Sequence, residues 1–221
     1  EILAALVSGD VAGLKFFRVM QAELRGTPLT ISRTGYTGDL GYELWLPADK
    51  AVPVFDALME VGANHGIAPC GIWAMDIARI EAGLIMADVD YTSSHKALIE
   101  SQKSSPFEIN LGWAVSLSKG PFVGKKALLR EKQQGSTWQF VGIDVDWESL
   151  EAVYRDVGLP PKLPTVPWRT STPLYVNQTT QVGYASSGCW SPLLKRYIAL
   201  AHIEAGYAKP GTEVQMEVTV E

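Results

Sequence analysis

The sequence predicts an α+β protein in which a mixed region of helices and strands, residues 1–119, precedes a strand-rich region, residues 120–221. Helical and strand-like patterns follow each other without strict alternation before the Lys119-Gly120-Pro121 segment. After it, short strand-like runs dominate, which is typical of a small β-barrel or sandwich. With 221 residues and 47% apolar side chains, the chain can bury one large core or two small ones.

The first region opens with a short helical pattern from Ile2 to Val7, which Gly9 is expected to end. Two strands are predicted next, Leu29 to Arg33 and Gly41 to Leu46. Aliphatic, β-branched and aromatic residues there flank a glycine-rich loop. We therefore expect a hairpin-like unit.

Two longer helices are predicted after the hairpin. Asp49 can cap the first, whose apolar side chains recur at three- and four-residue spacing until Gly62. The second covers roughly Trp73 to Ala82 and ends near Gly83. A further strand is predicted from Ile109 to Leu117.

The strand-rich region contains a short helical pattern from Lys125 to Glu131. Its predicted strands are Gln139 to Val145, Pro173 to Val176, Gln181 to Ala185, Ile198 to Ile203 and Glu213 to Val220. The segment from Trp147 to Trp168 is rich in proline, and we expect an irregular surface excursion there.

Composition and charge argue against several classes of function. The formal charge of -5 and the lack of long Lys/Arg runs oppose nucleic-acid binding. Apolar stretches fall far short of the ~20 residues that cross a bilayer, and no secretory leader pattern is seen. Cys70 and Cys189 lack CxxC spacing, so we expect thiols in a reducing, cytoplasmic compartment. His65, His95 and His202 lack metal-ligand spacing, and no metal site is predicted.

The most informative stretch runs from Arg33 to Glu43, with the sequence RTGYTGDLGYE. Its glycines let the backbone approach a ligand closely, and Tyr36 offers a stacking surface. Strand alternation places Glu43 on the same face as Trp45. A carboxylate accepts two hydrogen bonds from a 2-amino-pyrimidinone edge, so Glu43 is a candidate anchor for a planar heterocycle. Alternatively, Tyr36 and Glu43 are ordinary hairpin residues, and the glycines only shape a turn.

The stretch resembles the RTGYTGE-x-G-(F/Y)-E motif of the glycine-cleavage T-protein (aminomethyltransferase) superfamily. A second block, Gly66 to Gly83, is similar to that family's helix with the sequence A-R-D-x-L-R-(I/L)-E-A-G. A third, Ser105 to Lys125, contains the segments SPFE, LGW and FVGK. The last, Ser186 to Thr212, contains SSGCWSP and PGT. The blocks cover nearly the whole chain, which is identified as an N-terminally truncated member of this superfamily.

The resemblance implies a folate-binding domain, of which residues 1–119 are a partial, ferredoxin-like portion, followed by a C-terminal β-barrel in residues 120–221. It implies an enzyme that passes an aminomethyl or methyl unit from a substrate amine or sulfur to tetrahydrofolate. By motif position, Glu43 corresponds to the family's pterin-binding glutamate and Tyr36 to a tyrosine of the same pocket. Trp113 is a further pocket candidate, with a role as a core aromatic as the alternative. The implied partners are a folate, a methylated or aminomethyl donor and a lipoyl carrier protein.

Two departures from the family pattern bear on activity. Ala74-Met75-Asp76 stands where the family has A-R-D, so an apolar thioether replaces an arginine that contacts folate. The family's catalytic aspartate lies in a region that would precede Glu1, so the catalytic residue is unknown. Asp76, Arg79 and Glu81 can meet a ligand from the helix. We favour instead a local salt bridge between the Asp and the Arg, which are three residues apart.

Three functions therefore stand side by side. The first is a tetrahydrofolate-dependent one-carbon transferase, a divergent member that handles another methylated amine, sulfur or ether substrate. The second is a non-catalytic folate-binding module, as in iron-sulfur assembly or as the folate domain of a larger dehydrogenase. The third is a structural remnant that binds nothing. We adopt the first as the prediction and keep the second as its alternative.

Overall fold

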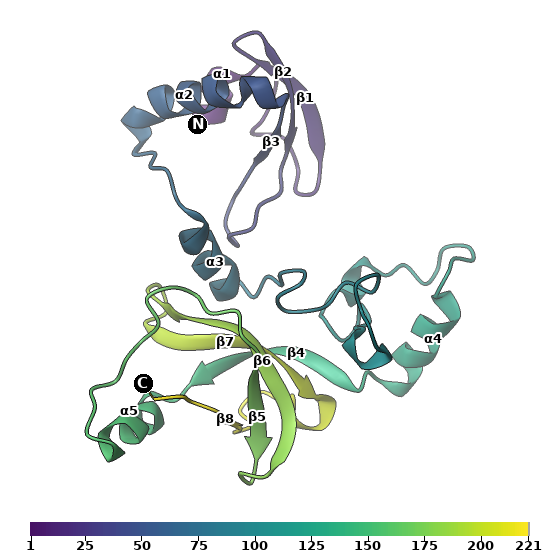
Figure 1. The fold of residues 1–221 in the computed structure, drawn as a ribbon. Helices are drawn as coiled ribbons and strands as arrows, with labels where there is room; N and C mark the ends of the chain where they lie inside the picture. Colours follow the sequence, from purple (N-terminus) through teal and green to yellow (C-terminus); the bar gives the residue numbers. More distant parts are fainter. Residues whose placement is uncertain (221) are drawn as a thin grey trace. The chain divides into compact units, whose positions relative to one another are not determined.

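The computed structural model describes residues 1–220. The chain divides into two compact units, Glu1–Ala78 and Arg79–Glu221. Both units contain helices and strands, which confirms the α+β prediction at this level (Figure 1). No helix in the described part of the chain combines the length and the apolar character that crossing a membrane requires.

The first unit is a three-stranded antiparallel sheet with two helices on one face (Figure 1). The sheet contains β1 (Val19–Leu24), β2 (Thr27–Ser32) and β3 (Glu43–Trp45), in that order. Helices α1 (Ile2–Leu6) and α2 (Ala51–Gly62) cover the face that the alternating apolar residues of the strands form. The buried core consists of Val7, Val11, Leu14, Leu24, Leu29, Ile31, Val54 and Ala57.

Two features of this unit differ from the sequence predictions. The sequence patterns do not predict β1, although Arg25 and Gly26 form the turn of a tight hairpin, with φ of 47° and 83°. Positive φ at both central residues matches the twist of the flanking strands. Asp49 does not cap α2, because it lies within the 3₁₀ turn η1 (Ala48–Lys50), and the N-cap Lys50 makes no side-chain cap bond.

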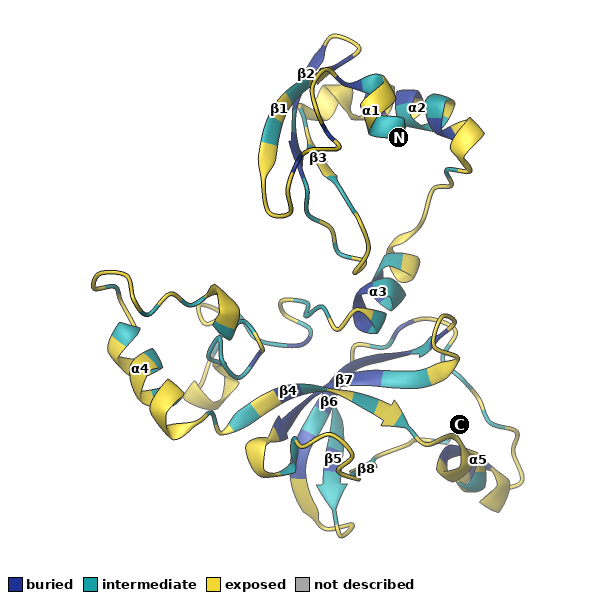
Figure 2. Cartoon of the chain, turned by 180° about the vertical axis from the view of Figure 1, so that it is seen from behind, coloured by how far each residue is buried: buried dark blue, intermediate teal, exposed yellow. Residues whose placement is uncertain are grey.

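The second unit contains a five-stranded antiparallel sheet in the order β4-β7-β6-β5-β8. Its strands are β4 (Trp138–Val145), β5 (Thr172–Val176), β6 (Thr180–Ser191), β7 (Arg196–Glu204) and β8 (Gln215–Met216). Buried residues are concentrated on β6 and β7 (Figure 2). The predicted C-terminal sheet is confirmed, while its closure into a barrel stays a prediction because β4 and β8 are the outer strands of this order.

Two segments of the second unit correct the sequence predictions. Residues 109–117 contain the 3₁₀ turn η4 (Gly112–Ala114) in place of a strand. The helix α5 (Trp147–Asp156) occupies the first half of the segment that was expected to be irregular. Asp146 caps it by accepting a hydrogen bond from the Ser149 backbone N–H at 2.7 Å. The prolines lie beyond this helix, so they do not oppose it.

The other elements follow the predictions closely. Helix α3 (Ile72–Glu81) is followed by Gly83 in the left-handed region, with φ of 70°. Helix α4 (Lys125–Gln134) begins at the predicted residue and extends one turn further. The remaining short elements are the 3₁₀ turns η2 (Ala63–His65), η3 (Glu100–Gln102) and η5 (Ala205–Tyr207).

Candidate functional site

The loop between β2 and β3 narrows to a neck where two glycines meet. A Cβ on Gly35 would lie 3.3 Å from the Cα of Gly41, and a Cβ on Gly41 would lie 3.2 Å from the Cα of Gly35. Gly38, between them in sequence, has φ of 83°, a conformation that side chains disfavour. The glycines therefore serve the packing and the turn of the loop itself.

Two side chains fasten this loop to the segment that precedes β1. Arg33 donates from Nη1 to the Leu14 carbonyl oxygen at 2.7 Å. The Tyr42 hydroxyl donates to the Val11 carbonyl oxygen at 3.3 Å. These bonds satisfy backbone acceptors in a segment without regular structure, so they hold the loop at a defined place beside the sheet.

Hydrogen bonds within the described residues hold the Glu43 carboxylate through one of its two oxygens, Oε2. Glu43 lies opposite Ser32 in the antiparallel register, and the Ser32 hydroxyl donates to Oε2 at 3.2 Å. The Thr34 hydroxyl makes a short hydrogen bond to the same oxygen. Among the hydrogen bonds found in residues 1–220, none ends on Oε1. Because the side chain is exposed, Oε1 is available to a hydrogen-bond donor from solvent or a ligand.

An open, partly aromatic surface surrounds this carboxylate. Residues directly opposed in a sheet point to the same face. The face away from the helices carries two cross-strand rows, Val19–Ser32–Glu43 and Gln21–Thr30–Trp45. The Trp45 side chain is 63% exposed, and its Nε1–H donates to the Ser32 hydroxyl at 3.3 Å. The surface thus combines a hydrogen-bond acceptor with a flat ring, as recognition of a planar heterocycle requires.

The three residues singled out from sequence lie in different parts of the chain. Glu43 begins β3, and Tyr36 lies half-buried in the loop before it, both within the first unit. Trp113 belongs to the second unit, lies on η4 and is 70% exposed, so its alternative role as a core aromatic is wrong. Sequence reasoning did not single out Ser32 and Thr34. Hydroxyl residues flanking the glycine-rich loop were the available signal.

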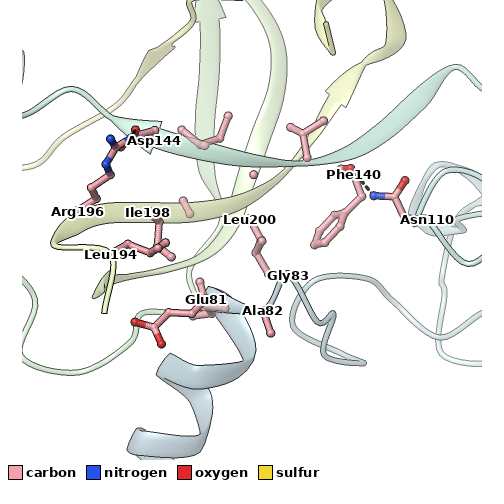
Figure 3. A pocket seen from close by; sticks show the side chains of 15 residues that line it. Glu81, Ala82, Gly83, Asn110, Phe140, Asp144, Leu194, Arg196, Ile198 and Leu200 are labelled. Carbon is pink, nitrogen blue, oxygen red and sulfur yellow. Dashed lines mark hydrogen bonds and ion pairs between the residues drawn. The ribbon is translucent and has the colours of Figure 1, made fainter. Parts of the chain in front are cut away.

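Each unit also has a pocket that excludes these residues. The pocket of the first unit, ≈ 520 Å³, is lined in part by Arg33, Leu40 and Tyr42. The pocket of the second unit, ≈ 450 Å³, lies between the end of α3 and the strands β4 and β7 (Figure 3). Its wall is mostly apolar, with the exposed ion pair of Asp144 and Arg196 at one end (Figure 3). Neither pocket includes Glu43, Tyr36 or Trp113 in its lining.

The polar residues at the end of α3 bind protein groups. Arg79, fully buried, forms an ion pair through Nη1 with Asp90 Oδ2 at 2.5 Å. The Met86 backbone N–H donates to the same oxygen at 2.8 Å. Ser186 and Ser187 donate to Asp90 Oδ1 at 2.6 and 2.7 Å. Arg79 is thus a structural residue, as favoured from sequence, with Asp90 as a partner that the spacing did not predict.

A β-bulge explains how adjacent serines bind one oxygen. Neighbouring residues of a regular strand point to opposite faces. The register of β6 on β7 shifts between Ala185 and Ser187, so Ser186 is the extra residue of a bulge. This shift allows both hydroxyls to reach Asp90. The SSGCWSP block is therefore occupied with holding the second unit together.

Glu81 and His202 complete this buried region. Glu81 Oε1 accepts hydrogen bonds from the Ser191 hydroxyl at 2.5 Å and the Leu193 N–H at 3.3 Å. His202 is buried, stacks on Tyr184 with 5.1 Å between ring centroids, and its Nε2 lies 2.5 Å from the Asp90 carbonyl oxygen. Burial lowers the pKa of His202, against the opposing effects of that bond and of the nearby Asp90 and Glu108 carboxylates.

Residues 1–220 contain neither grouped metal ligands nor a disulfide. Among residues 1–220, no three His, Cys, Asp or Glu side chains are grouped to hold a metal ion. Cys70 is exposed and Cys189 is buried, and they form no disulfide.

Two family models and several known proteins match the chain. The family model of the GCVT N-terminal domain matches residues 1–119, and that of the glycine cleavage T-protein C-terminal barrel domain matches residues 155–221. An aminomethyltransferase of Halothermothrix orenii is 34% identical over 218 residues, 99% of this chain and 54% of that protein. A trimethylamine-oxide aldolase of Ruegeria pomeroyi is 35% identical over 208 residues, 92% of this chain and 23% of that protein.

A solved structure is similar along the same length. The crystal structure of glycine cleavage system aminomethyltransferase T from Bartonella henselae has a TM-score of 0.74 and 26% identity. It is matched over 98% of this chain and 52% of that chain. The chain thus spans about half the length of the aminomethyltransferases that it matches.

Proposed function

Because the chain belongs to the glycine cleavage T-protein family, we propose that it serves the transfer of an aminomethyl or methyl group to tetrahydrofolate, with Glu43 as the pterin anchor. The observation that carries the proposal is the exposed Glu43 carboxylate, fixed through Oε2 and open at Oε1, beside the exposed Trp45 ring. Tyr36, in the loop between the paired glycines Gly35 and Gly41, is proposed to line the same pocket, and the role of Trp113 stays a prediction from the sequence.

The chemistry of a pterin suits this surface. Its 2-amino-4-oxo edge offers N–H donors, and an ionised carboxylate is the acceptor that binds such donors most strongly. Its pyrimidinone ring is flat also in the reduced folate, so it can stack on the exposed indole of Trp45. The reduced folate would act as the acceptor of the one-carbon unit, and the chain's residues would bind and orient it.

The donor is proposed by class only. Relatives are named aminomethyltransferase and trimethylamine-oxide aldolase, which favours an amine that carries an aminomethyl or methyl group. A lipoyl carrier protein is the proposed partner for an aminomethyl donor. Met75, on α3, is apolar where the family has an arginine, so we propose no folate contact from this position. No residue is assigned a catalytic role.

The domain assignment belongs to the same proposal. Residues 1–119 would be the partial, ferredoxin-like portion of the folate-binding domain, and residues 120–221 the C-terminal barrel. The match of residues 155–221 to a barrel family supports closure of the second sheet. A cytoplasmic location remains a prediction from the cysteine pattern.

A second function, a folate-binding module without its own transfer activity, is favoured by one observation. The chain corresponds to 23% of the trimethylamine-oxide aldolase that it matches, so this architecture also occurs as a small part of a larger polypeptide. Such a module would bind a reduced folate and leave the chemistry to other parts of the protein. Folate binding without methyl or aminomethyl transfer would favour this second function.

The proposal is tested by calorimetric titration of the chain with 5-formyltetrahydrofolate. Glu43→Gln is expected to weaken binding by about 1–3 kcal/mol, because a charge-assisted acceptor is lost. Glu23→Gln is the matched control, since Glu23 is an exposed carboxylate on β1 of the same sheet. Equal affinity of Glu43→Gln and the wild-type chain would refute the pterin-anchor assignment.

A further inference from the structure

We propose that Trp45, Ser32 and Thr34 form a directional hydrogen-bond chain that positions Glu43, so that Glu43 recognises its ligand through Oε1 alone. This inference rests on the proposed pterin site and deepens it. It assigns the specificity of that site to three positioning residues and predicts which carboxylate oxygen contacts the ligand.

The first step is the geometry of the cluster. Trp45 Nε1–H donates to the Ser32 hydroxyl oxygen at 3.3 Å. The hydroxyl oxygens of Ser32 and Thr34 are 2.8 Å apart. Thr34 makes the short bond to Glu43 Oε2, and the Ser32 hydroxyl oxygen lies 3.2 Å from the same atom. Ser32, Thr34 and Glu43 are thus in mutual contact, and Trp45 joins them through Ser32.

The second step is a count of hydrogens. Each hydroxyl has one hydrogen, and the indole has one N–H, so these three groups supply three donors. An ionised carboxylate only accepts. Thr34 therefore donates to Glu43, Ser32 shares its hydrogen between Thr34 and Glu43, and Trp45 donates to Ser32. The donor direction therefore runs from Trp45 through Ser32 and Thr34 to Glu43, and such chains strengthen cooperatively.

The third step concerns the oxygen that remains. With Oε2 engaged by two hydroxyl groups, a ligand that bound both carboxylate oxygens would have to displace one of them. Oε1 accepts none of the hydrogen bonds found in residues 1–220 and belongs to an exposed side chain. The ligand's exocyclic amino group and adjacent ring N–H are therefore both served by Oε1, which has two lone pairs.

Binding through Oε1 alone predicts that the site loses selectivity when the hydrogen-bond chain of Trp45, Ser32 and Thr34 is interrupted. A carboxylate that is no longer held can rotate, and its discrimination between ligands with and without the amino donor falls. Thr34 bonds Glu43 directly, Ser32 both directly and through Thr34, and Trp45 only through Ser32. The effect is therefore expected to be larger at Thr34 and Ser32 than at Trp45.

The test compares two ligands, 5-formyltetrahydrofolate and its 2-desamino-2-methyl analogue, by calorimetry on the full chain. The wild-type ratio of dissociation constants is expected to fall about tenfold in Thr34→Val and Ser32→Ala, and about threefold in Trp45→Phe, which keeps a ring. Thr34→Ser, which keeps the hydroxyl, should retain the ratio. Thr30→Val is the matched control, because the Thr30 hydroxyl on the same strand bonds Gln21 at 3.1 Å.

Each possible result of this test overturns or supports a specific part of the proposal. A purely structural role would weaken both ligands equally and leave the ratio unchanged, which overturns the positioning role. Tighter binding in Thr34→Val would mean that the hydroxyls compete with the ligand, and would overturn it as well. Glu43→Gln, measured in the same series, separates failure of the positioning role from failure of the proposed function. If it weakens binding while Thr34→Val and Ser32→Ala keep the ratio, only this inference fails. If it has no effect, or the wild-type chain binds neither ligand, the proposed function fails with it.

Discussion

Glu43 in the first unit and Asp90 in the second are both carboxylates that accept hydrogen bonds from a pair of hydroxyl groups. Asp90 is buried, and its oxygens also receive the Arg79 guanidinium and the Met86 N–H. Glu43 is exposed, and only one of its oxygens is held. The similar partners therefore lead to different roles: a saturated buried carboxylate holds a fold together, and a half-saturated exposed one remains able to bind.

The comparison also separates the two motif blocks. The RTGYTGDLGYE loop ends in an acceptor that faces solvent, whereas the SSGCWSP block has its first two hydroxyls committed to Asp90. Similarity to a family motif alone does not distinguish these cases. The burial of the carboxylate and the number of its lone pairs that accept hydrogen bonds distinguish them.

The largest effect is expected when the buried carboxylate loses its charge. Asp90→Asn removes the carboxylate charge that pairs with the buried Arg79 guanidinium and should lower the free energy of unfolding by about 3–5 kcal/mol. Hydrogen exchange of the β6 and β7 amides measures the loss. Asp88→Asn is the control, because Asp88 lies on the same loop, is exposed and pairs with Lys96. Unchanged protection in Asp90→Asn would show that the ion pair does not hold the unit.

Removing one hydroxyl from the bulge should have a smaller effect. Ser187→Ala deletes one of the bonds to Asp90 and is expected to cost about 1.5–3 kcal/mol, the usual range for a hydrogen bond to a charged group. Urea unfolding provides the value, with Ser118→Ala, an exposed serine, as the control. If Ser187→Ala and Ser118→Ala are equally stable, the bulge is not required for binding Asp90.

A weaker effect is expected from pH through His202. Burial lowers the pKa of His202 below its ordinary value of 6.5, so the unfolded chain binds a proton more readily than the folded one. Stability should therefore fall as pH decreases below 6.5 toward the lowered pKa, and it should be insensitive to this group above 6.5. Unfolding curves between pH 7.5 and about 5 measure it. His202→Phe should reduce the dependence of the free energy of unfolding on pH. His95→Phe, at an exposed site, should leave that dependence unchanged.

The smallest effect on stability is expected at the proposed binding carboxylate. Glu43→Gln replaces an exposed group and should change the free energy of unfolding by less than about 0.5 kcal/mol. The same variant should weaken folate binding, so stability and affinity respond separately. Thermal unfolding without ligand measures the first. A destabilisation comparable to that of Asp90→Asn would remove the contrast between the two carboxylates.

Several parts of the fold were predictable from local patterns. The alternation that places Glu43 and Trp45 on one face appears in the structure, since both are exposed while Leu44 between them is packed inward. Strand β1 was harder to predict, because Gln21 and Glu23 lie on its open face and interrupt the apolar residues that indicate a strand. Residues 109–117 have strand-like composition, but their backbone groups turn back on themselves, as in the bond from the Val115 N–H to the Gly112 carbonyl oxygen.

The sequence by itself determined the loop that needs glycine at its neck and the face on which Glu43 lies, because these depend on residues close together in the chain. Only the tertiary structure decided which polar residues are bound by protein. Asp90 meets Ser186 and Ser187 across separations of 96 and 97 residues, and a one-residue bulge makes both contacts possible. Such register details depend on packing of the whole unit, which short-range patterns do not specify.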